Sequence, residues 1–489
     1  MRMGLLRLLL ATSLPIGILA AAEEKGGLAP AIFGDHMVLQ RQMEVPIWGI
    51  TAAGGTVTVQ FMKQTKTATA DDKGRWRVTL DKMEAVNEPQ QLTIKAAAET
   101  RVFKDVLVGE VWLCSGQSNM EMPVKSADDF SREAAAATDG RIRHFKVRFR
   151  PLWHPESRLD GPFKPDPITK AETGKWVVCS PRSVGQFTAC GYFMARQLRR
   201  ELNVPIGMID ASYGGTPIEA WTPPAALLEG AAAPPAGGKS EDRPPPKEKA
   251  AALYNGMIHP LVGYGMRGLV WYQGEANRRD GMGYVQKMKT MVDRWRTLWG
   301  GGEFPVHFVQ IAPLDNKPGE PSDLLPRFWA AQSAAAATIP NASMAVINDI
   351  SDPKEIHPTT KQEVGRRLAL LALHHTYGRK DVECSGPVFK AATPQGDRMR
   401  VTFDHAAGLK SRDGRPLSWF EVRGDGTDWA KAGATIDGET VVVSAAEVAR
   451  PVAVRFAWSK VAEPNLTNGA GLPTAAFNTS PAAAAPKKR

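Results

Sequence analysis

Short runs of alternating apolar and polar residues occur near both ends of the chain. Such runs cover residues 57–61 and 76–80, and they return at residues 400–403, 440–443 and 452–456. A period of two is typical of strands that bury one face and expose the other. Turn-forming residues separate the first two runs. The pattern therefore predicts a small antiparallel β-domain in the N-terminal part of the chain and a second β-domain in the C-terminal part.

The middle of the chain has a different pattern, in which short apolar runs alternate with segments of helical period. Residues 193–202 and 284–299 have helical spacing. A last helix is expected from near Thr359 to Gly378. Thr359 and Gln362 could form a capping box at its start. The strand candidates are residues 106–114, 206–211, 269–272, 306–311 and 344–347. This alternation predicts an α/β fold with a parallel sheet covered on both faces by helices.

The beginning of the chain has the features of a secretory signal. Arg2 and Arg7 precede an interrupted apolar run, and the small residues 20–22 follow it. The apolar run is shorter than the roughly 20 residues that span a bilayer. We expect cleavage after Ala22, a secreted or periplasmic protein, and no stable membrane span in the mature chain.

The same patterns predict the domain limits. We expect a β-domain over residues 23–104, an α/β domain over residues 105–378, a second β-domain over residues 379–480 and a disordered tail over residues 481–489. A Pro/Gly-rich stretch at residues 231–252 is expected to form an exposed insertion in the α/β domain.

Composition, cysteine spacing and charge exclude several classes of protein. The chain has 489 residues, of which 43% are hydrophobic and 23% charged, which excludes a disordered or collagen-like chain. The four cysteines have no C-x-x-C spacing, so no zinc or thioredoxin-like motif is indicated; disulfides and buried thiols both remain open. The net charge of +10 would fall to +8 with loss of the two signal arginines. Basic clusters are short, and residues 141–150 alternate basic with apolar residues, which predicts a strand with one solvated face rather than nucleic-acid binding.

Candidate chemistry gathers after several predicted strands. Ser118 follows the strand that ends near Cys114, and ligands bind beyond the carboxyl ends of parallel strands. The surrounding sequence is not the G-x-S-x-G elbow, so Ser118 is either a turn residue or a nucleophile. A Gly-rich turn at residues 213–216 and amide groups at residues 273–277 follow two other strands. These groups either stabilise an oxyanion or simply form tight turns.

A histidine follows the last predicted strand. His357 has the acids Asp349, Asp352 and Glu355 within eight residues upstream, and a helix begins just after it. A general base needs an acceptor that is neutral near pH 7 and a group that orients it. The other histidines lack such surroundings and are expected to be structural.

Several segments together resemble the sialate O-acetylesterase family of the SGNH hydrolase superfamily. The segments that carry the resemblance are residues 109–122 (GEVWLCSGQSNMEM), 214–221 (GGTPIEAW), 254–258 (YNGMI), 271–277 (WYQGEAN) and 356–368 (IHPTTKQEVGRRL). Their order and spacing match throughout nearly the whole mature chain. The resemblance implies an SGNH-type three-layer α/β/α domain flanked by β-sandwich-like domains.

The resemblance also implies roles for individual residues. Ser118 would be the nucleophile and His357 its base, and an oxyanion would be bound by the backbone N–H groups of Ser118 and Gly215 and by the Gln273 side chain. Asn119, Glu275 and Asn277 are candidates for supporting roles. The acid stays open between Asp352, Glu355 and Asp349, and a Ser–His dyad is the alternative. No metal and no cofactor are implied.

The implied function is a secreted esterase that removes acetyl groups from an O-acetylated carbohydrate by a serine acyl-enzyme mechanism. The sugar would be sialic acid or a related glycan, with acetylxylan or another plant glycan as the alternative. A second hypothesis is a non-catalytic glycan-binding protein, and nucleic-acid binding is the third.

Overall fold

The computed structural model describes residues 27–97, 99–161, 163–225, 244–315 and 318–480. The predicted signal (1–22), the predicted tail (481–489) and the first part of the predicted insertion lie outside the described residues. Of that insertion, residues 244–252 are described.

A parallel sheet forms the centre of the molecule, as the sequence predicts. Its strands follow the order β13-β12-β11-β7-β10-β8-β9, and neighbours are parallel except for the antiparallel pair of β8 and β9. The strands span β7 (Glu99–Gly116), β8 (Ile142–Lys146), β9 (Trp176–Val178), β10 (Ile206–Ser212), β11 (Gly268–Tyr272), β12 (Val306–Val309) and β13 (Ala342–Ala345). The predicted strands 106–114, 206–211 and 269–272 are thus present almost in full.

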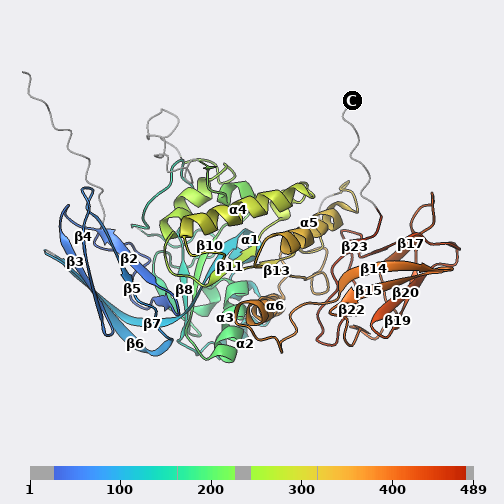
Figure 1. The fold of residues 1–489 in the computed structure, drawn as a ribbon, viewed down its shortest axis with the longest axis horizontal. Coiled ribbons are helices and arrows are strands. Elements are labelled where there is room, and N and C mark those ends of the chain that lie inside the picture. Colours follow the sequence, from blue (N-terminus) through green and yellow to red (C-terminus); the bar gives the residue numbers. More distant parts are fainter. Residues whose placement is uncertain (1–26, 98, 162, 226–243, 316–317, 481–489) are drawn as a thin grey trace, which may run out of the picture.

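Helices cover both faces of this sheet (Figure 1). One face carries α3 (Ala189–Leu202) and α6 (Lys361–Leu371), which pack together, and the other carries α4 (Gly283–Trp299) and α5 (Leu324–Thr338). Short helices α1 (Ser118–Glu121) and α2 (Phe130–Ala136) follow β7. Strands β10 and β11 are buried at every position, because helices cover the sheet on both sides.

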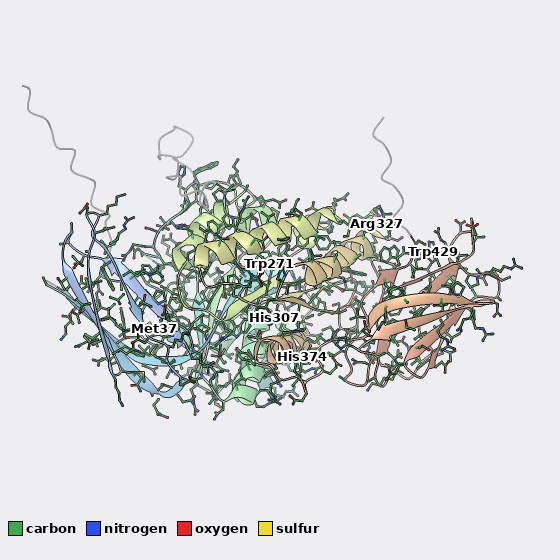
Figure 2. All side chains as sticks on the ribbon, viewed as in Figure 1. Met37, Trp271, His307, Arg327, His374 and Trp429 are labelled. Atoms are coloured by element: carbon green, nitrogen blue, oxygen red, sulfur yellow. The ribbon has the colours of Figure 1, made fainter. Side chains whose placement is uncertain are left out.

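The alternation of side chains along β7 separates two hydrophobic clusters. Val111 and Leu113 belong to the cluster that contains residues of α4 and α5, and Trp112 and Cys114 belong to the cluster with α3 and α6. On β11, Trp271 lies in the first cluster, at the centre of the molecule (Figure 2). The α/β/α expectation is confirmed.

The N-terminal strands are joined to the central sheet through β7. Its first half pairs with β6 (Val86–Ala96) and β1 (Val38–Gln40), and its second half pairs with β10 and β11. The strand therefore runs through the predicted limit between residues 104 and 105. The remaining N-terminal strands are β2 (Val45–Ile50), β3 (Thr56–Phe61), β4 (Gln64–Thr69) and β5 (Arg75–Leu80).

The C-terminal part of the chain is a set of antiparallel strands, as expected. The larger groups have the orders β14-β15-β20-β19 and β18-β17-β21-β23, and β16 pairs with β22. The strands span β14 (Val388–Gln395), β15 (Arg398–Asp404), β16 (Lys410–Ser411), β17 (Phe420–Arg423), β18 (Ala430–Lys431), β19 (Gly433–Asp437), β20 (Thr440–Ser444), β21 (Ala453–Phe456), β22 (Leu466–Thr467) and β23 (Phe477–Asn478).

Two local expectations are wrong. Thr359 and Gln362 do not cap α6: the N-cap residue is Thr360, without a side-chain cap bond, and Gln362 donates to the carbonyl oxygen of Asp128. Strand β8 is buried at every position instead of having a solvated face. Its cations are paired with carboxylates of neighbouring segments, Arg143 with Asp105 at 2.7 Å and Lys146 with Asp210 at 3.0 Å.

The structure also bears on disulfide bonds and on membrane spans. All four cysteines are buried as free thiols. None of the described helices is both long and apolar enough to cross a bilayer.

The close packing of α3 on α6 makes Gly365 a sensitive position. A Cβ atom there would lie 2.4 Å from Cβ of Phe193 and 2.7 Å from the backbone nitrogen of Met194. We expect Gly365→Ala to lower the free energy of unfolding by about 1–3 kcal/mol, because overpacking forces the helices apart. Gly283→Ala is the control, since a Cβ there has no neighbour within 4 Å. Urea titrations that give equal midpoints for both variants would contradict this packing argument.

Candidate active site

The ends of three adjacent strands bring the first site residues together. Strand β7 lies between β10 and β11, and its last residue, Gly116, has φ +135°. A Cβ atom on Gly116 would lie 2.2 Å from the carbonyl oxygen of Tyr272, so only glycine allows this close approach. The backbone of Gln117 donates to the same carbonyl at 3.0 Å. Ser118, the first residue of α1, is thereby fixed between the ends of β10 and β11.

The loop between β13 and α6 carries His357 to Ser118. Nε2 of His357 lies 2.8 Å from Oγ of Ser118. Ser118 is half-buried and His357 is exposed, so solvent can reach the pair. Partial burial lowers the pKa of His357 below its usual value, the charge of Lys361 lowers the pKa further, and the charge of Glu355 opposes this. The imidazole is therefore neutral near pH 7 and able to accept a proton.

The three acids proposed for His357 lie in different environments. Asp349 is buried and forms a two-pronged ion pair with Arg367, at 2.6 and 2.7 Å. Asp352 accepts the backbone N–H of Lys354 at 2.9 Å within a turn. Glu355 is exposed. Among the described residues, no carboxylate forms a hydrogen bond or ion pair with His357, so the structure brings none of the three into contact with the imidazole.

The Gly-rich turn after β10 lies beside Ser118. A Cβ atom on Gly214 would be 3.2 Å from Cβ of Ser118, and Gly215 has φ +73°. Within the described part of the chain, no acceptor takes the backbone N–H of Ser118 or of Gly215. Two free donors at the start of a helix and in a glycine turn are what an oxyanion requires.

Gln273 departs from its predicted role. Its Nε2 donates to the carbonyl oxygen of Thr216 at 3.2 Å and to Oδ1 of Asn277 at 2.7 Å, and its Oε1 accepts the hydroxyl of Tyr284 at 2.8 Å. A primary amide has two hydrogens, and both are used here. The buried Gln273 side chain therefore ties the end of β11 to the Gly-rich turn instead of presenting a free donor.

Asn119 joins the segments around Ser118. Its Nδ2 donates to Oε1 of Glu275 at 2.7 Å and to the carbonyl oxygen of Ile356 at 2.9 Å, and its Oδ1 accepts from Nζ of Lys361 at 2.8 Å. Asn119, Glu275 and Lys361 are all buried. Ile356 directly precedes His357, so this amide holds the histidine loop against α1. The sequence alone assigns no role to Lys361, although this residue lies in a segment that carries the family resemblance.

Comparisons with known proteins decide the family. A family model described as carbohydrate esterase, sialic acid-specific acetylesterase, matches residues 108–374. The chain belongs to this family. Sialate O-acetylesterase of Homo sapiens is 30% identical over 416 residues, with 78% of this chain and 77% of that protein covered; its Rattus norvegicus counterpart is 28% identical, with 87% and 88% covered. A solved carbohydrate acetylesterase from Xanthomonas citri has a TM-score of 0.82 at 35% identity, covering 92% of this chain and 99% of that one. The chain is thus a carboxylic ester hydrolase.

Other polar groups of the esterase lie away from this pair. His307 on β12 lies in the interior of the molecule (Figure 2). Its ring bonds to the hydroxyls of Ser343 and Thr376. Burial lowers the pKa of His307 to about 3, so it is a neutral structural residue. No group of three or more His, Cys, Asp or Glu side chains within the described ranges is arranged to hold a metal ion.

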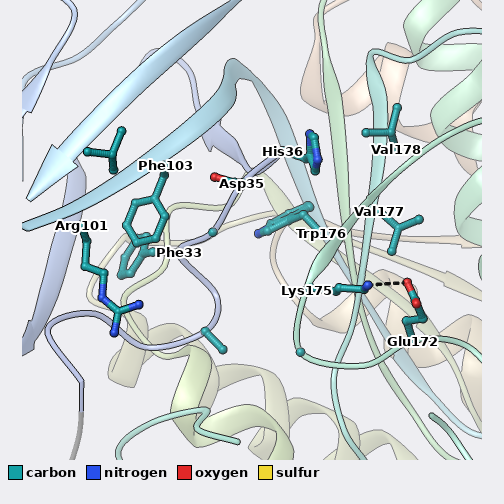
Figure 3. A pocket seen from close by; sticks show the side chains of 14 residues that line it. Phe33, Asp35, His36, Arg101, Phe103, Glu172, Lys175, Trp176, Val177 and Val178 are labelled. Atoms are coloured by element: carbon teal, nitrogen blue, oxygen red, sulfur yellow. Dashed lines mark ion pairs between the residues drawn. The ribbon is translucent and has the colours of Figure 1, made fainter. Parts of the chain in front are cut away.

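A separate hollow lies between the N-terminal strands and β9. It has a volume of about 690 Å³ and is lined by Phe33, Phe103 of β7 and Trp176 of β9 (Figure 3). Neither Ser118 nor His357 lines this hollow.

Glu121 connects α1 to the Gly-rich turn. Its Oε2 accepts the backbone N–H of Gly214 at 2.7 Å, and its Oε1 is buried without a hydrogen bond in the described part of the chain. Burial raises the pKa of Glu121 from 4.5 to about 7. The folded esterase therefore holds this proton to a higher pH than the unfolded chain does.

We expect this proton to make stability depend on pH. As pH rises from 4.5 to about 7, the unfolded chain releases the Glu121 proton first, so the free energy of unfolding falls, by on the order of 3 kcal/mol. Glu121→Gln removes the titrating group, and its stability should fall less over this window. Urea unfolding at pH 4.5 and 7.5 measures the difference, with the exposed Glu88→Gln as control. Parallel pH profiles for wild type and Glu121→Gln would contradict the assignment.

Proposed function

We propose that the esterase removes acetyl groups from O-acetylated carbohydrates, with Ser118 as the nucleophile. The observation that carries the proposal is the 2.8 Å contact between Oγ of Ser118 and Nε2 of His357 at the ends of the central strands. The names of the relatives support the acetylated carbohydrate, since they include sialate O-acetylesterases and a carbohydrate acetylesterase.

The proposed reaction is acyl transfer in two steps. Neutral His357 takes the proton of Ser118 as Oγ attacks the acetyl carbonyl carbon, and the C=O electron pair moves to oxygen. The backbone N–H groups of Ser118 and Gly215 bind the resulting anion. The imidazolium then protonates the departing sugar oxygen, and the C–O bond to the sugar breaks. Water attacks the acetyl-enzyme by the same route and releases acetate.

Glu355 is the acid we assign to His357. Its charge raises the pKa of the imidazole, whereas Asp352 is engaged in a turn and Asp349 is neutralised by Arg367. An exposed carboxylate two residues before the histidine acts on the imidazolium through the electrostatic field or after a side-chain rotation. This makes Ser118 and His357 the reacting pair and Glu355 an electrostatic support.

Sialic acid is the sugar we favour, and the place of action is outside the cytoplasm. The family description and the mammalian relatives name sialate, whereas the Xanthomonas citri relative is named for carbohydrates in general. A net charge of +8 in the mature chain would steer anionic sugars toward the enzyme. Residues 1–22 have the arrangement of a secretory signal.

The substrate assignment is tested by acetate release. Wild type should release acetate from 4-nitrophenyl acetate. Its kcat/KM should be higher for O-acetylated sialosides than for acetylated xylo-oligosaccharides. Ser118→Ala should lose at least about 10³-fold in kcat, because it has no nucleophile. Equal rates for wild type and Ser118→Ala would refute the serine mechanism. A preference for xylo-oligosaccharides would refute sialate and leave the mechanism intact.

The base and its acid are tested by three substitutions. His357→Ala should lose turnover as severely as Ser118→Ala. Glu355→Gln should lower kcat/KM by about 10-fold and move the acidic limb of its pH profile to lower pH, since the carboxylate raises the pKa of His357. Asp352→Asn, the matched exposed control, should stay within about 2-fold. If both acid variants match wild type, the Ser–His pair works without an acid.

A further inference from the structure

The described end of the Pro/Gly-rich insertion lies against the Gly-rich turn. Lys247 follows Pro244, Pro245 and Pro246, and its Nζ donates to the carbonyl oxygen of Gly214 at 2.7 Å. The same ammonium would lie 3.2 Å from a Cβ atom on Gly215 and lies 5.2 Å from the ring centre of Tyr213. The Tyr213 ring in turn stacks on Phe149 at 3.6 Å. Lys247 is half-buried and pairs with no carboxylate of the described residues.

This contact is made to one particular peptide unit. The carbonyl of Gly214 and the N–H of Gly215 belong to the same planar amide. The N–H of Gly215 is one of the two donors assigned to the oxyanion. The neighbouring peptide is fixed as well, because the N–H of Gly214 is bound by Oε2 of Glu121 at 2.7 Å. Glycines have little conformational preference of their own, so these two side chains determine how the turn is oriented.

We propose that Lys247 is a positioning residue that aims and polarises the Gly214–Gly215 peptide as an oxyanion donor. The inference rests on the proposed function. A cation on the carbonyl oxygen withdraws electron density through the amide and strengthens its N–H as a donor. Carbonyl oxygen and amide hydrogen point in opposite directions, so Lys247 acts through the peptide and does not contact the substrate.

The physical consequence is selective for the transition state. The substrate carbonyl is neutral and gains little from a stronger donor, whereas the tetrahedral intermediate carries a full negative charge. Loss of Lys247 should therefore lower kcat and leave KM nearly unchanged. Losing a complete donor costs about 10²- to 10³-fold, and weakening one should cost about 10-fold.

Three variants and one control test the proposal with 4-nitrophenyl acetate, which has no sugar and no negative charge. Lys247→Met, which keeps the length and removes the charge, should lower kcat by about 10-fold with KM within about 3-fold. Lys247→Arg, which keeps a cationic donor, should restore kcat to within about 3-fold of wild type. Lys249→Met is the matched control, because its Nζ lies 5.8 Å over the ring of Trp153 and away from the turn. If thermal unfolding shows that Lys247→Met is destabilised, Lys247→Gln replaces it as the variant without the charge.

The outcomes separate this inference from the proposed function. Wild-type kcat in Lys247→Met and Lys247→Gln, with Ser118→Ala inactive, would overturn the role of Lys247 and leave the serine mechanism standing. An active Ser118→Ala would overturn both. A raised KM for O-acetylated sialosides without any change in kcat toward 4-nitrophenyl acetate would show that Lys247 binds the substrate carboxylate, which also overturns the positioning role.

Discussion

The buried amide of Asn119 is the contact on which the site geometry depends. Its three hydrogen bonds reach the segment after β11, the histidine loop after β13 and the first residue of α6. These segments are distant in sequence, and the next residue on one side of Asn119 is Ser118. A buried amide that loses a partner leaves unsatisfied polar groups, which costs about 1–3 kcal/mol for each. The amide therefore couples the position of Ser118 to that of His357.

The parallel sheet explains why a single amide can reach so many segments. Strands β10, β7 and β11 end at one edge, and Gly116 allows β7 to approach the carbonyl of Tyr272 closely enough for Gln117 to bond to it. The Gly-rich turn, Ser118 and the Gln273 segment then follow as neighbours. Side chains from these segments complete the connection, since Gln273 bonds to Thr216 and Glu121 bonds to Gly214.

Periodicity was enough to predict the sheet, because it is a property of local sequence. Position after a strand made Ser118 and His357 candidates, and only the family resemblance predicted that they act as a pair. The acid could not be predicted in this way. Asp349, Asp352 and Glu355 lie within eight residues of His357, and only the tertiary partner Arg367 and the turn at Lys354 distinguish them. The same limit applies to Gln273, whose amide is consumed by distant partners, and to strand β8, whose charges are compensated from other segments.

Positive charges near the site have two opposite effects, one on an oxyanion and one on the pKa of His357. A positive field stabilises an oxyanion, yet the buried Lys361 that organises Asn119 also lowers the pKa of His357 and so weakens the base. Glu355 opposes this effect on the imidazole from the exposed side. Lys247 donates to the Gly214 carbonyl and is not among the charges that shift the pKa of His357, so in its proposed role it would act on the anion through the peptide. Under the proposed mechanism, these charge positions would let oxyanion binding and a neutral His357 occur together in one small site.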